Sequence, residues 1–430
     1  MWDQLPELIL TQIFGHLGRN DLAAVGQVCQ AWNRALSSPV LWRSVTVLID
    51  RDLRGEFPLA GKLATKYGQH MRILELAWSR PYVLPIETRL ARNVQAEAGV
   101  DFLAIVRDKD VQLKKLVLTD WVFSSKWDNR GKLLYALANF LGSQKNLKSL
   151  SLLNANLGVS DVLRLLGAIA RSCGDRLGCL DLRGAFREWQ APHSNSRYLR
   201  LLGRLHALTT ISLDYPALSD QALNALARAA SGVLRTLHIS VRDSDSRQHT
   251  LDDTAWHNLV TACPHLTVSY SIVNISHYED MCYLLLPSVP LASFQMFSGH
   301  VWDQSRSRNF RSTVGLLIDH YTNTLAEVML QLRNNRELLD DLLISMVTRC
   351  KHLERLQYDG ILRSLDTLKD VLQLQSESKT RFRTIHVKPR NANALNRAIL
   401  REISTQYDNK MVEQGVDFRI EDPASFFVFY

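Results

Sequence analysis

The stretch Leu147-Lys148-Ser149-Leu150-Ser151-Leu152 has the spacing L-x-x-L-x-L, and this pattern recurs along most of the chain. Apolar residues that alternate with polar ones are typical of a short, half-buried strand. The clearest further copies begin at Leu113, Leu177, Leu208, Leu234, Leu325, Leu353 and Phe382, and weaker copies centre on Leu74, Val268 and Phe294. The sequence therefore contains an internal repeat, and its unit includes a strand.

Amphipathic helical stretches separate these strands. Ser219-Asp220 and Ser160-Asp161 precede apolar runs as N-caps do, and Asp252-Asp253 opens a further helix. Each strand–loop–helix unit buries its apolar face only against its neighbours, which predicts a solenoid with parallel strands on the concave face and helices outside. An all-helical repeat of the armadillo kind is the alternative, but the three-then-two spacing favours a strand. The predicted fold class is α/β.

The repeat is irregular. The step from Leu74 to Leu116 is 42 residues, and the step from Ile211 to Leu237 is 26. Regular leucine-rich repeats measure about 20–29 residues and carry an asparagine after the strand, which binds backbone groups of the loop. The matching positions here hold Trp121, Ala155, Ala185 and Pro216. We therefore expect loop hydrogen bonds that differ from repeat to repeat.

The N-terminal segment has a different pattern. In residues 2–17, Leu5-Pro6 predicts a helix start, and apolar residues then recur at helical spacing up to Leu17. Gly18 is expected to end this helix, and Asn20 or Asp21 to cap the next. Leu22, Val25, Cys29 and Trp32 form a second stripe that ends at Ser37-Ser38-Pro39. About 45 residues with this many large apolar groups cannot bury all of them alone, so a partner or the following domain must cover some.

The motifs Trp2-Asp3-x-Leu5-Pro6, Val28-Cys29-x-x-Trp32 and Leu41-Trp42 resemble an F-box in order and spacing. With the repeats, and with the segments at 332–340 and 218–223, they make the chain similar to F-box proteins that carry leucine-rich repeats, the group that includes F-box only protein 39. The resemblance implies a three-helix module that docks on Skp1. It places the docking on Leu5, Pro6, Leu8, Ile9, Ile13, Trp32 and Trp42. Many F-boxes carry an acidic residue in place of Leu8, so one polar contact is expected to be missing. From periodicity alone, an ordinary N-terminal helical cap is the alternative.

The predicted domains are an F-box at 1–45, a solenoid at 46–390 and a C-terminal cap at 391–430. Residues 42–49 alternate and predict a strand that caps the first repeat and joins the two modules rigidly; a helix is expected at 59–67. The cap is expected to hold a helix with Leu395, Ile399 and Ile403, followed by the apolar strand 426–430. It would cover the core of the last repeat.

Composition sets further limits. The 430 residues are 46% hydrophobic and 22% charged, as in folded globular proteins. No apolar run approaches the roughly 18 residues that span a bilayer, and no secretory signal is evident, so we expect the cytoplasm or nucleus and no membrane contact. Among six cysteines, Cys173, Cys263 and Cys350 each follow an apolar helical run. They are expected in repeat cores, with a zinc or disulfide role as the alternative.

Motifs for catalysis or cofactor binding are not found. The sequence has no phosphate loop, no G-x-S-x-G or H-E-x-x-H motif and no EF-hand loop, and its 13 histidines are scattered singly. We therefore expect no metal, no cofactor and no catalytic residues.

The residues between the strand leucines are expected to point to the concave face and to form a polar binding surface. The candidates for contact with a substrate are Asp181, Arg183, Asp214, His238, Gln357, Asp359, His386 and Lys388, with Ser212, Ser240 and Gln331 beside them. Simple solvation of these side chains is the alternative.

Residues 379–401 hold seven Lys or Arg residues and no Asp or Glu, in a chain with a net charge of +8. Such a segment can attract acidic or phosphorylated partners, although a solvated face without a role is equally open. Without aromatic interleaving or a known module, nucleic-acid binding is disfavoured.

A docking module joined to a repeat surface points to an adaptor. The leading hypothesis is a substrate-recognition subunit of an SCF-type ubiquitin ligase, with Skp1, cullin-1 through Skp1, and an unknown protein substrate as partners. A scaffold that binds Skp1 without cullin, or serves another partner, is the alternative.

Overall fold

In the computed structural model of the protein, the described residues are 4–53, 58–78, 85–119, 121, 130–187, 190–245, 249–275, 277–298, 309–334, 337–390 and 393–421. The chain forms two compact units. The first comprises Met1–Gln190 and Ser196–Leu208, and the second comprises Ala191–Asn195 and Thr209–Tyr430. The predicted domain boundaries at residues 45 and 390 stay predictions.

The first unit begins with three short helices, α1 (Glu7–Phe14), α2 (Arg19–Val25) and α3 (Gln30–Leu36), and the 3-10 turn η2 (Pro39–Trp42). Leu10, Phe14, Val25 and Ala35 form their buried core. Two details of the prediction were wrong. Gly15, not Gly18, follows the first helix, and Gly18 is the N-cap of α2 in place of Asn20 or Asp21.

The second predicted stripe is also two helices rather than one. Cys29 is extended, with φ −160° and ψ 168°, and it starts α3 in a new direction. The side-chain amide of Asn33 donates to the carbonyl of Gly26 at 2.8 Å and holds the turn between α2 and α3. The turn lets the ring of Trp32 pack edge-on against Phe14, with centroids 5.5 Å apart.

Strands and helices then alternate through the rest of the first unit. The strands are β1 (Ser44–Leu48), β2 (Ile73–Ala77), β3 (Lys115–Thr119), β4 (Ser149–Ser151) and β5 (Cys179–Asp181). The helical elements are α4 (Ile49–Asp52), α5 (Leu59–Tyr67), η3 (Gly68–His70), α6 (Pro85–Asp108), α7 (Arg130–Ser143), α8 (Val159–Ser172) and α9 (Ser196–Leu202). The predicted helix at 59–67 is confirmed, and the strand predicted at 42–49 is present as β1 but is shorter, because Trp42 belongs to η2 and Ile49 to α4.

The second unit continues the alternation. Its strands are β6 (Thr210–Asp214), β7 (Thr236–Arg242), β8 (Thr267–Val273), β9 (Leu291–Ser298), β10 (Glu327–Leu332), β11 (Arg355–Gly360), β12 (Thr384–Pro389) and β13 (Asp417–Ile420). Its helical elements are η4 (Tyr215–Ala217), α10 (Asp220–Ala229), α11 (Asp253–Ala262), α12 (Tyr278–Leu284), α13 (Phe310–Tyr321), α14 (Asp340–Arg349), α15 (Asp366–Ser376) and α16 (Ala394–Glu413). No helix in the described part of the chain is long and apolar enough to span a bilayer.

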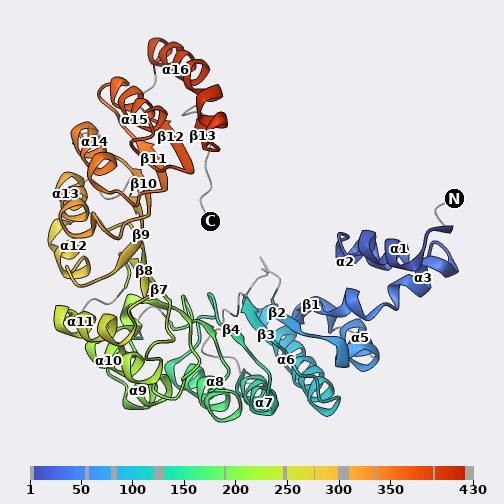
Figure 1. Cartoon of the computed structure of the whole chain (residues 1–430). Coiled ribbons are helices and arrows are strands. Elements are labelled where there is room, and N and C mark those ends of the chain that lie inside the picture. Colours follow the sequence, from blue (N-terminus) through green and yellow to red (C-terminus); the bar gives the residue numbers. More distant parts are fainter. Residues whose placement is uncertain are drawn as a thin grey trace. The chain divides into compact units, whose positions relative to one another are not determined.

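Within each unit, neighbouring strands pair in parallel and in sequence order, and the helices between them lie on one face of the sheet (Figure 1). The predicted α/β fold, a helical F-box followed by a leucine-rich-repeat solenoid, is confirmed. The other face of the sheet, which we name the open face, carries the residues that alternate with the strand leucines. Parallel strands need a crossover connection, and the helix between successive L-x-x-L-x-L segments supplies it.

The strand register aligns the centres that the sequence predicts. Val45, Leu74, Leu116, Leu150 and Leu180 pair in one row, and all are buried. In the second unit, a shift between Val268 and Ser269 pairs Phe294 with Tyr270 rather than with Val268. The copies at Val268 and Phe294 were predicted as equivalent, and this bulge offsets them.

Two expectations on the helices and the C-terminus need correction. Ser219 and Asp252 cap α10 and α11 as predicted, but α8 starts at Val159 with Gly158 as its N-cap, so Ser160 and Asp161 lie inside the helix. The strand β13 after α16 was not predicted. The predicted strand at 426–430 lies outside the described residues, as do Trp2 and Asp3.

The loops after β3 and β4 bind their backbone groups in different ways, as expected. The indole Nε1 of Trp121 donates to the carbonyl of Leu76 at 2.7 Å, and the Asn156 N–H donates to the carbonyl of Gly184 at 2.8 Å. Gly184 has φ +62°, and a Cβ there would lie 3.0 Å from the Cα of Asn154, so this close loop contact requires glycine.

One asparagine does take the role that leucine-rich repeats assign to it, one residue after the expected position. Asn334 is 2% exposed; its amide oxygen accepts from the Ile361 N–H at 2.8 Å, and its nitrogen donates to the Ile361 carbonyl at 3.0 Å. The same nitrogen lies 3.1 Å from the Glu337 carbonyl. Asn334 therefore ties two successive loops of the second unit.

We predict that Asn334→Ala lowers the free energy of unfolding by about 2 kcal/mol, because it leaves buried backbone groups of the loop without partners. Asn258→Ala, at an exposed position of α11, is the matched control and should change stability by less than about 0.5 kcal/mol. Urea unfolding of the full chain measures both. Equal, small effects of the two substitutions would contradict the role given to Asn334.

Candidate functional site

The predicted docking residues divide into two groups. Leu8, Ile9 and Ile13 point away from the F-box core on α1 and are 70%, 39% and 39% exposed. We name these three the apolar face of α1. Apolar side chains this exposed on one short helix mark a surface for a partner. Pro6, the exposed N-cap of α1, lies at the start of this helix.

The other three predicted residues have internal contacts. Leu5 and Trp32 pack against the buried core of the F-box helices. Trp42 stacks on Tyr67, with ring centroids 5.0 Å apart and an interplanar angle of 8°, and its Nε1 donates to the carbonyl of Leu36 at 2.8 Å. These residues support the docking surface from below. Two exposed apolar residues, Val28 and Val40, were not predicted as docking residues.

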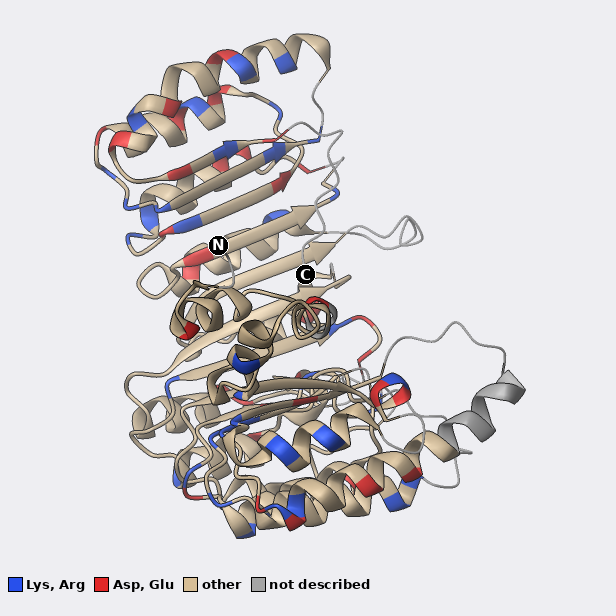
Figure 2. Cartoon of the chain, turned by 90° about the vertical axis from the view of Figure 1, so that its right-hand side faces the viewer, with Lys and Arg blue, Asp and Glu red and all other residues tan. Residues whose placement is uncertain are grey.

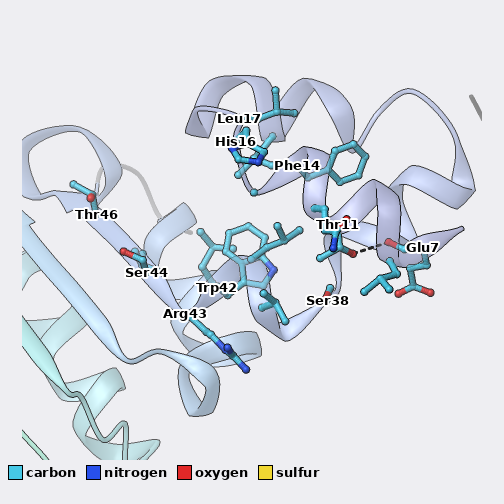
Figure 3. A pocket seen from close by; sticks show the side chains of 18 residues that line it. Glu7, Thr11, Phe14, His16, Leu17, Ser38, Trp42, Arg43, Ser44 and Thr46 are labelled. Atoms are coloured by element: carbon cyan, nitrogen blue, oxygen red, sulfur yellow. Dashed lines mark hydrogen bonds between the residues drawn. The ribbon is translucent and has the colours of Figure 1, made fainter. Parts of the chain in front are cut away.

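A groove of about 930 Å³ separates the F-box helices from the first strand. Figure 3 shows Thr11, His16 and Leu17 on one side, and Ser44 and Thr46 of β1 on the other, with Trp42 at its base. Leu8 and Val40 also line it, so the groove borders the apolar face of α1. The hydroxyl of Thr11 donates to the Glu7 carbonyl at 2.8 Å and so uses its hydrogen bond within α1.

The F-box is joined to the repeats by direct packing. The Trp42–Tyr67 stack links η2 to α5, and Lys66 Nζ lies 4.9 Å from the centroid of the Tyr67 ring. Strand β1 follows η2 after one residue, and its Val45 and Val47 are buried against the repeat. These contacts support the expected rigid connection, because no flexible segment lies between Trp42 and β1.

The predicted substrate-contact residues differ in how accessible they are. Asp181 and Arg183 belong to the first unit; the others belong to the second. Arg183 forms a bidentate ion pair with Asp181, with Nε–Oδ1 and Nη2–Oδ2 distances of 3.0 and 2.8 Å. Asp359 and Lys388 are buried, and the half-buried members are Asp181, Arg183, Asp214, His238, Gln357 and His386. A contact between these residues and a substrate stays a prediction.

The basic segment at 379–401 is partly neutralised by acids from its own and adjacent repeats. Arg390 clasps the buried carboxylate of Asp359 through two hydrogen bonds of 2.6 and 3.1 Å. Arg383 pairs with Glu354 at 3.2 Å, and Lys379 pairs with Glu377 at 2.6 Å. Figure 2 shows acidic and basic residues interspersed over these C-terminal repeats. The formal excess of seven positive charges therefore overstates the local field, which weakens the case for a phosphate or nucleic-acid site there.

Three cysteines lie in repeat cores, as expected. Cys173, Cys263 and Cys350 are buried free thiols, whereas Cys179 is exposed at the start of β5. Burial raises the pKa of the Cys350 thiol to about 11. Burial also raises the pKa of Cys173, against the smaller opposite effects of Ser172 and Arg176. Within the described residues, no three His, Cys, Asp or Glu side chains are placed to hold a metal ion.

Comparison with known proteins agrees with this geometry. The family model described as F-box-like matches residues 2–47. F-box/LRR-repeat protein 8 of Bos taurus is 26% identical over 365 residues, which cover 84% of this chain and 90% of that protein. The chain carries an F-box-like domain and is homologous to F-box/LRR-repeat proteins.

Two further F-box/LRR-repeat proteins show the same extent of similarity. F-box/LRR-repeat protein 8 of Homo sapiens is 24% identical over 350 residues, covering 81% of this chain and 86% of that protein. F-box/LRR-repeat protein 21 of Bos taurus is 21% identical over 369 residues, covering 83% and 76%. The similarity thus extends over the repeats as well as the F-box-like domain.

We predict that Arg390→Ala lowers the free energy of unfolding by on the order of 3 kcal/mol, because it leaves the buried Asp359 carboxylate without its partner. Arg401→Ala removes one charge from the same basic segment at an exposed position of α16, and should cost less than about 0.5 kcal/mol. Urea unfolding at neutral pH compares the two variants. A loss for Arg390→Ala as small as that for Arg401→Ala would show that the pair is not structural.

For the thiols, we predict that iodoacetamide at about pH 8 modifies Cys179 of the native protein at least tenfold faster than Cys173 or Cys350, since only a thiolate reacts. Time-resolved labelling followed by peptide mass spectrometry gives the rates. The unfolded protein in urea is the control, in which the three rates should converge. Comparable native rates would mean that the repeat cores open readily.

Proposed function

We propose that this chain is the substrate-recognition subunit of an SCF-type ubiquitin ligase. The apolar face of α1 docks on Skp1, Skp1 recruits cullin-1, and the repeats hold a protein substrate. The observation that carries the proposal is an F-box-like domain that leaves Leu8, Ile9 and Ile13 exposed and is packed directly onto a repeat array. Within the F-box/LRR-repeat proteins, we also infer a closer relation to the group of F-box only protein 39.

The energetics favour docking through this face. Covering exposed Leu and Ile side chains stabilises a complex by about 25 cal/mol per Å² of apolar area removed from water. The large apolar residues of such a patch carry most of the binding energy, and the groove beside Leu8 and Val40 enlarges the surface that a partner can cover. The F-box core stays intact under such a partner, because its α1 members Leu10 and Phe14 are already buried and are not part of the exposed apolar face.

The chain's own role in ubiquitin transfer is positioning. Direct packing of Trp42 on Tyr67 holds the F-box-like domain against the first repeat. A rigid connection keeps a bound substrate near the ubiquitin-charged enzyme and raises the effective concentration of its lysines. In this proposal the chemistry belongs to other chains, and the protein acts in the cytoplasm or nucleus.

The substrate surface is proposed to be the open face of the repeats. There the half-buried Asp214, His238 and Gln357 stand on ordered strands, where few side-chain conformations are lost on binding. Asp359 belongs to the structure rather than to this surface, because its carboxylate is buried under Arg390. The polar, half-buried character of this face favours a protein partner that binds by hydrogen bonds.

The test uses Leu8→Asp/Ile13→Asp, because these exposed positions can be changed without entering the F-box core. We predict that the double variant binds purified Skp1 at least tenfold more weakly than wild type, a loss of at least about 1.4 kcal/mol. Val412→Asp, at an exposed apolar position of α16, is the matched control. Calorimetry measures Skp1 affinity, and circular dichroism checks that each variant is folded.

Co-purification with cullin-1 then separates the two classes of function. Recovery of both Skp1 and cullin-1 by wild type and Val412→Asp, but not by Leu8→Asp/Ile13→Asp, is the expected result. Recovery of Skp1 without cullin-1 would support the non-ligase scaffold instead. If folded wild type binds no Skp1, the docking proposal is wrong.

A further inference from the structure

Three aromatic rings stack among the loops of the second unit. His193 lies in the segment Ala191–Asn195, Tyr215 in η4 after β6, and His249 between β7 and α11. The ring centroids of His193 and His249 are 4.0 Å apart with an interplanar angle of 18°. Tyr215 stacks on His249 at 5.1 Å and 15°. The rings therefore connect loops that are far apart in sequence.

Hydrogen bonds fix this stack to the start of α10. Nε2 of His249 lies 2.6 Å from the carbonyl oxygen of Leu218. Because a carbonyl only accepts, Nε2 carries the hydrogen, and Nδ1 is the unprotonated nitrogen of the neutral ring. Ser219, the N-cap of α10, donates its hydroxyl to the His193 carbonyl at 2.9 Å and accepts from the Ala222 N–H at 3.2 Å. The Tyr215 hydroxyl donates to the His249 carbonyl at 3.1 Å.

The surroundings of the His249 imidazole favour its neutral form. The Nδ1 atoms of both His193 and His249 are buried and have no hydrogen-bond partner among the residues that the structure describes. Burial is the main reason that the pKa of His249 lies below its ordinary value, and the charge of His193 lowers it further. The Leu218 carbonyl and the carboxylate of Asp220 act in the opposite direction but are outweighed. The neutral phenol of Tyr215 supplies no compensating charge.

We propose that the His193–His249 stack is an acid-sensitive joint of the repeat array. At neutral pH the uncharged rings hold the loops before α10 and α11 together. Protonation of both rings places two positive charges with centroids 4.0 Å apart in a half-buried site. Like charges in such a site repel strongly, so the stack separates and the N-cap of α10 loses its support from the His193 loop.

The direction of the pH dependence follows from linkage. His249 has a lower pKa in the closed stack than in an open or unfolded loop, so the open state binds more protons as the pH falls. The stack therefore contributes its full stabilisation of the closed loops above the ordinary histidine pKa of about 6.5, and this contribution decreases as the pH falls below that value. Asp220 Oδ1 accepts a hydrogen bond from the Asp252 N–H at 2.9 Å. Opening of the stack at His249 therefore also weakens the contact that holds Asp252, the N-cap of α11. This inference holds whether or not the F-box-like domain recruits Skp1.

The test is hydrogen–deuterium exchange of the full chain at about pH 7.5 and about pH 5.5, corrected for the intrinsic exchange rate, because histidine titrates between these values. In wild type, we expect protection of peptides over 214–224 and 249–256 to fall by at least about fivefold at the lower pH, because the open loops bind more protons than the closed stack. Peptides over α15 serve as the internal reference. His193→Phe keeps a ring to stack on His249 but removes one charge, so the loss should shrink to less than about threefold.

His257→Gln, at an exposed position of α11, is the matched control and should respond like wild type. The titration of His249 by NMR of histidine-labelled protein gives a second measurement, which does not depend on the stability of any variant. An apparent pKa below 6.5 in wild type, which rises in His193→Phe, supports the joint. Unchanged protection of wild type at low pH, or titration of His249 at or above the ordinary value, would overturn it.

Discussion

Each unit of this protein depends on burying the row of apolar residues that runs across its parallel strands. A single strand of three to eight residues with one helix cannot remove its leucines from water. The row Val45–Leu74–Leu116–Leu150–Leu180 solves this problem in the first unit, because each member is covered by its neighbours and by the helices on one face. The opposite face is then free to vary in polarity, and the proposed recognition surface of the repeats lies there.

The F-box-like domain obeys the same constraint with a different outcome. Its core of Leu10, Phe14, Val25 and Ala35 is small, so some of its apolar residues must be covered from outside. The repeats cover part of them, through Trp42 and Tyr67. The apolar face of α1 remains exposed, and this exposed apolar surface is the physical basis of the proposed docking.

Charge in the second unit serves mainly the structure. The pairs Arg390–Asp359, Arg383–Glu354 and Arg355–Glu327 each join neighbouring repeats. The exposed pairs add little stability, whereas the buried Asp359 depends on its arginine. The segment 379–401 is strongly basic in the sequence, but acidic partners from its own and adjacent repeats reduce its local net charge in the folded protein. The loops after the strands are also held in different ways. Regular repeats use one asparagine at each loop, whereas here the loops are held by Trp121, Asn334 and the His193–His249 stack.

The sequence by itself determined the class of fold, the position of almost every strand, and the presence of the F-box-like domain. The fold class and the strands follow from local periodicity, because leucines spaced three and two apart specify a strand with one buried face, whichever partner it meets. The F-box-like domain follows from the resemblance of its motifs. The helix boundaries at Gly15 and Gly158 and the break at Cys29 escaped this reasoning, because several residues nearby were equally able to end or cap a helix.

Only the tertiary structure decided what the individual side chains do. Leu5 and Leu8 belong to one apolar pattern, yet Leu8 is exposed while Leu5 packs on the core. Trp32 reaches the same core because the turn at Cys29 sets the direction of α3. Likewise, Gln357 and Asp359 both alternate with the buried residues of β11, but Gln357 is half-buried, whereas Asp359 is buried and binds Arg390 from the next repeat. Contacts between residues 31 positions apart, such as Arg390 with Asp359, depend on the register between neighbouring strands. The local sequence does not specify this register.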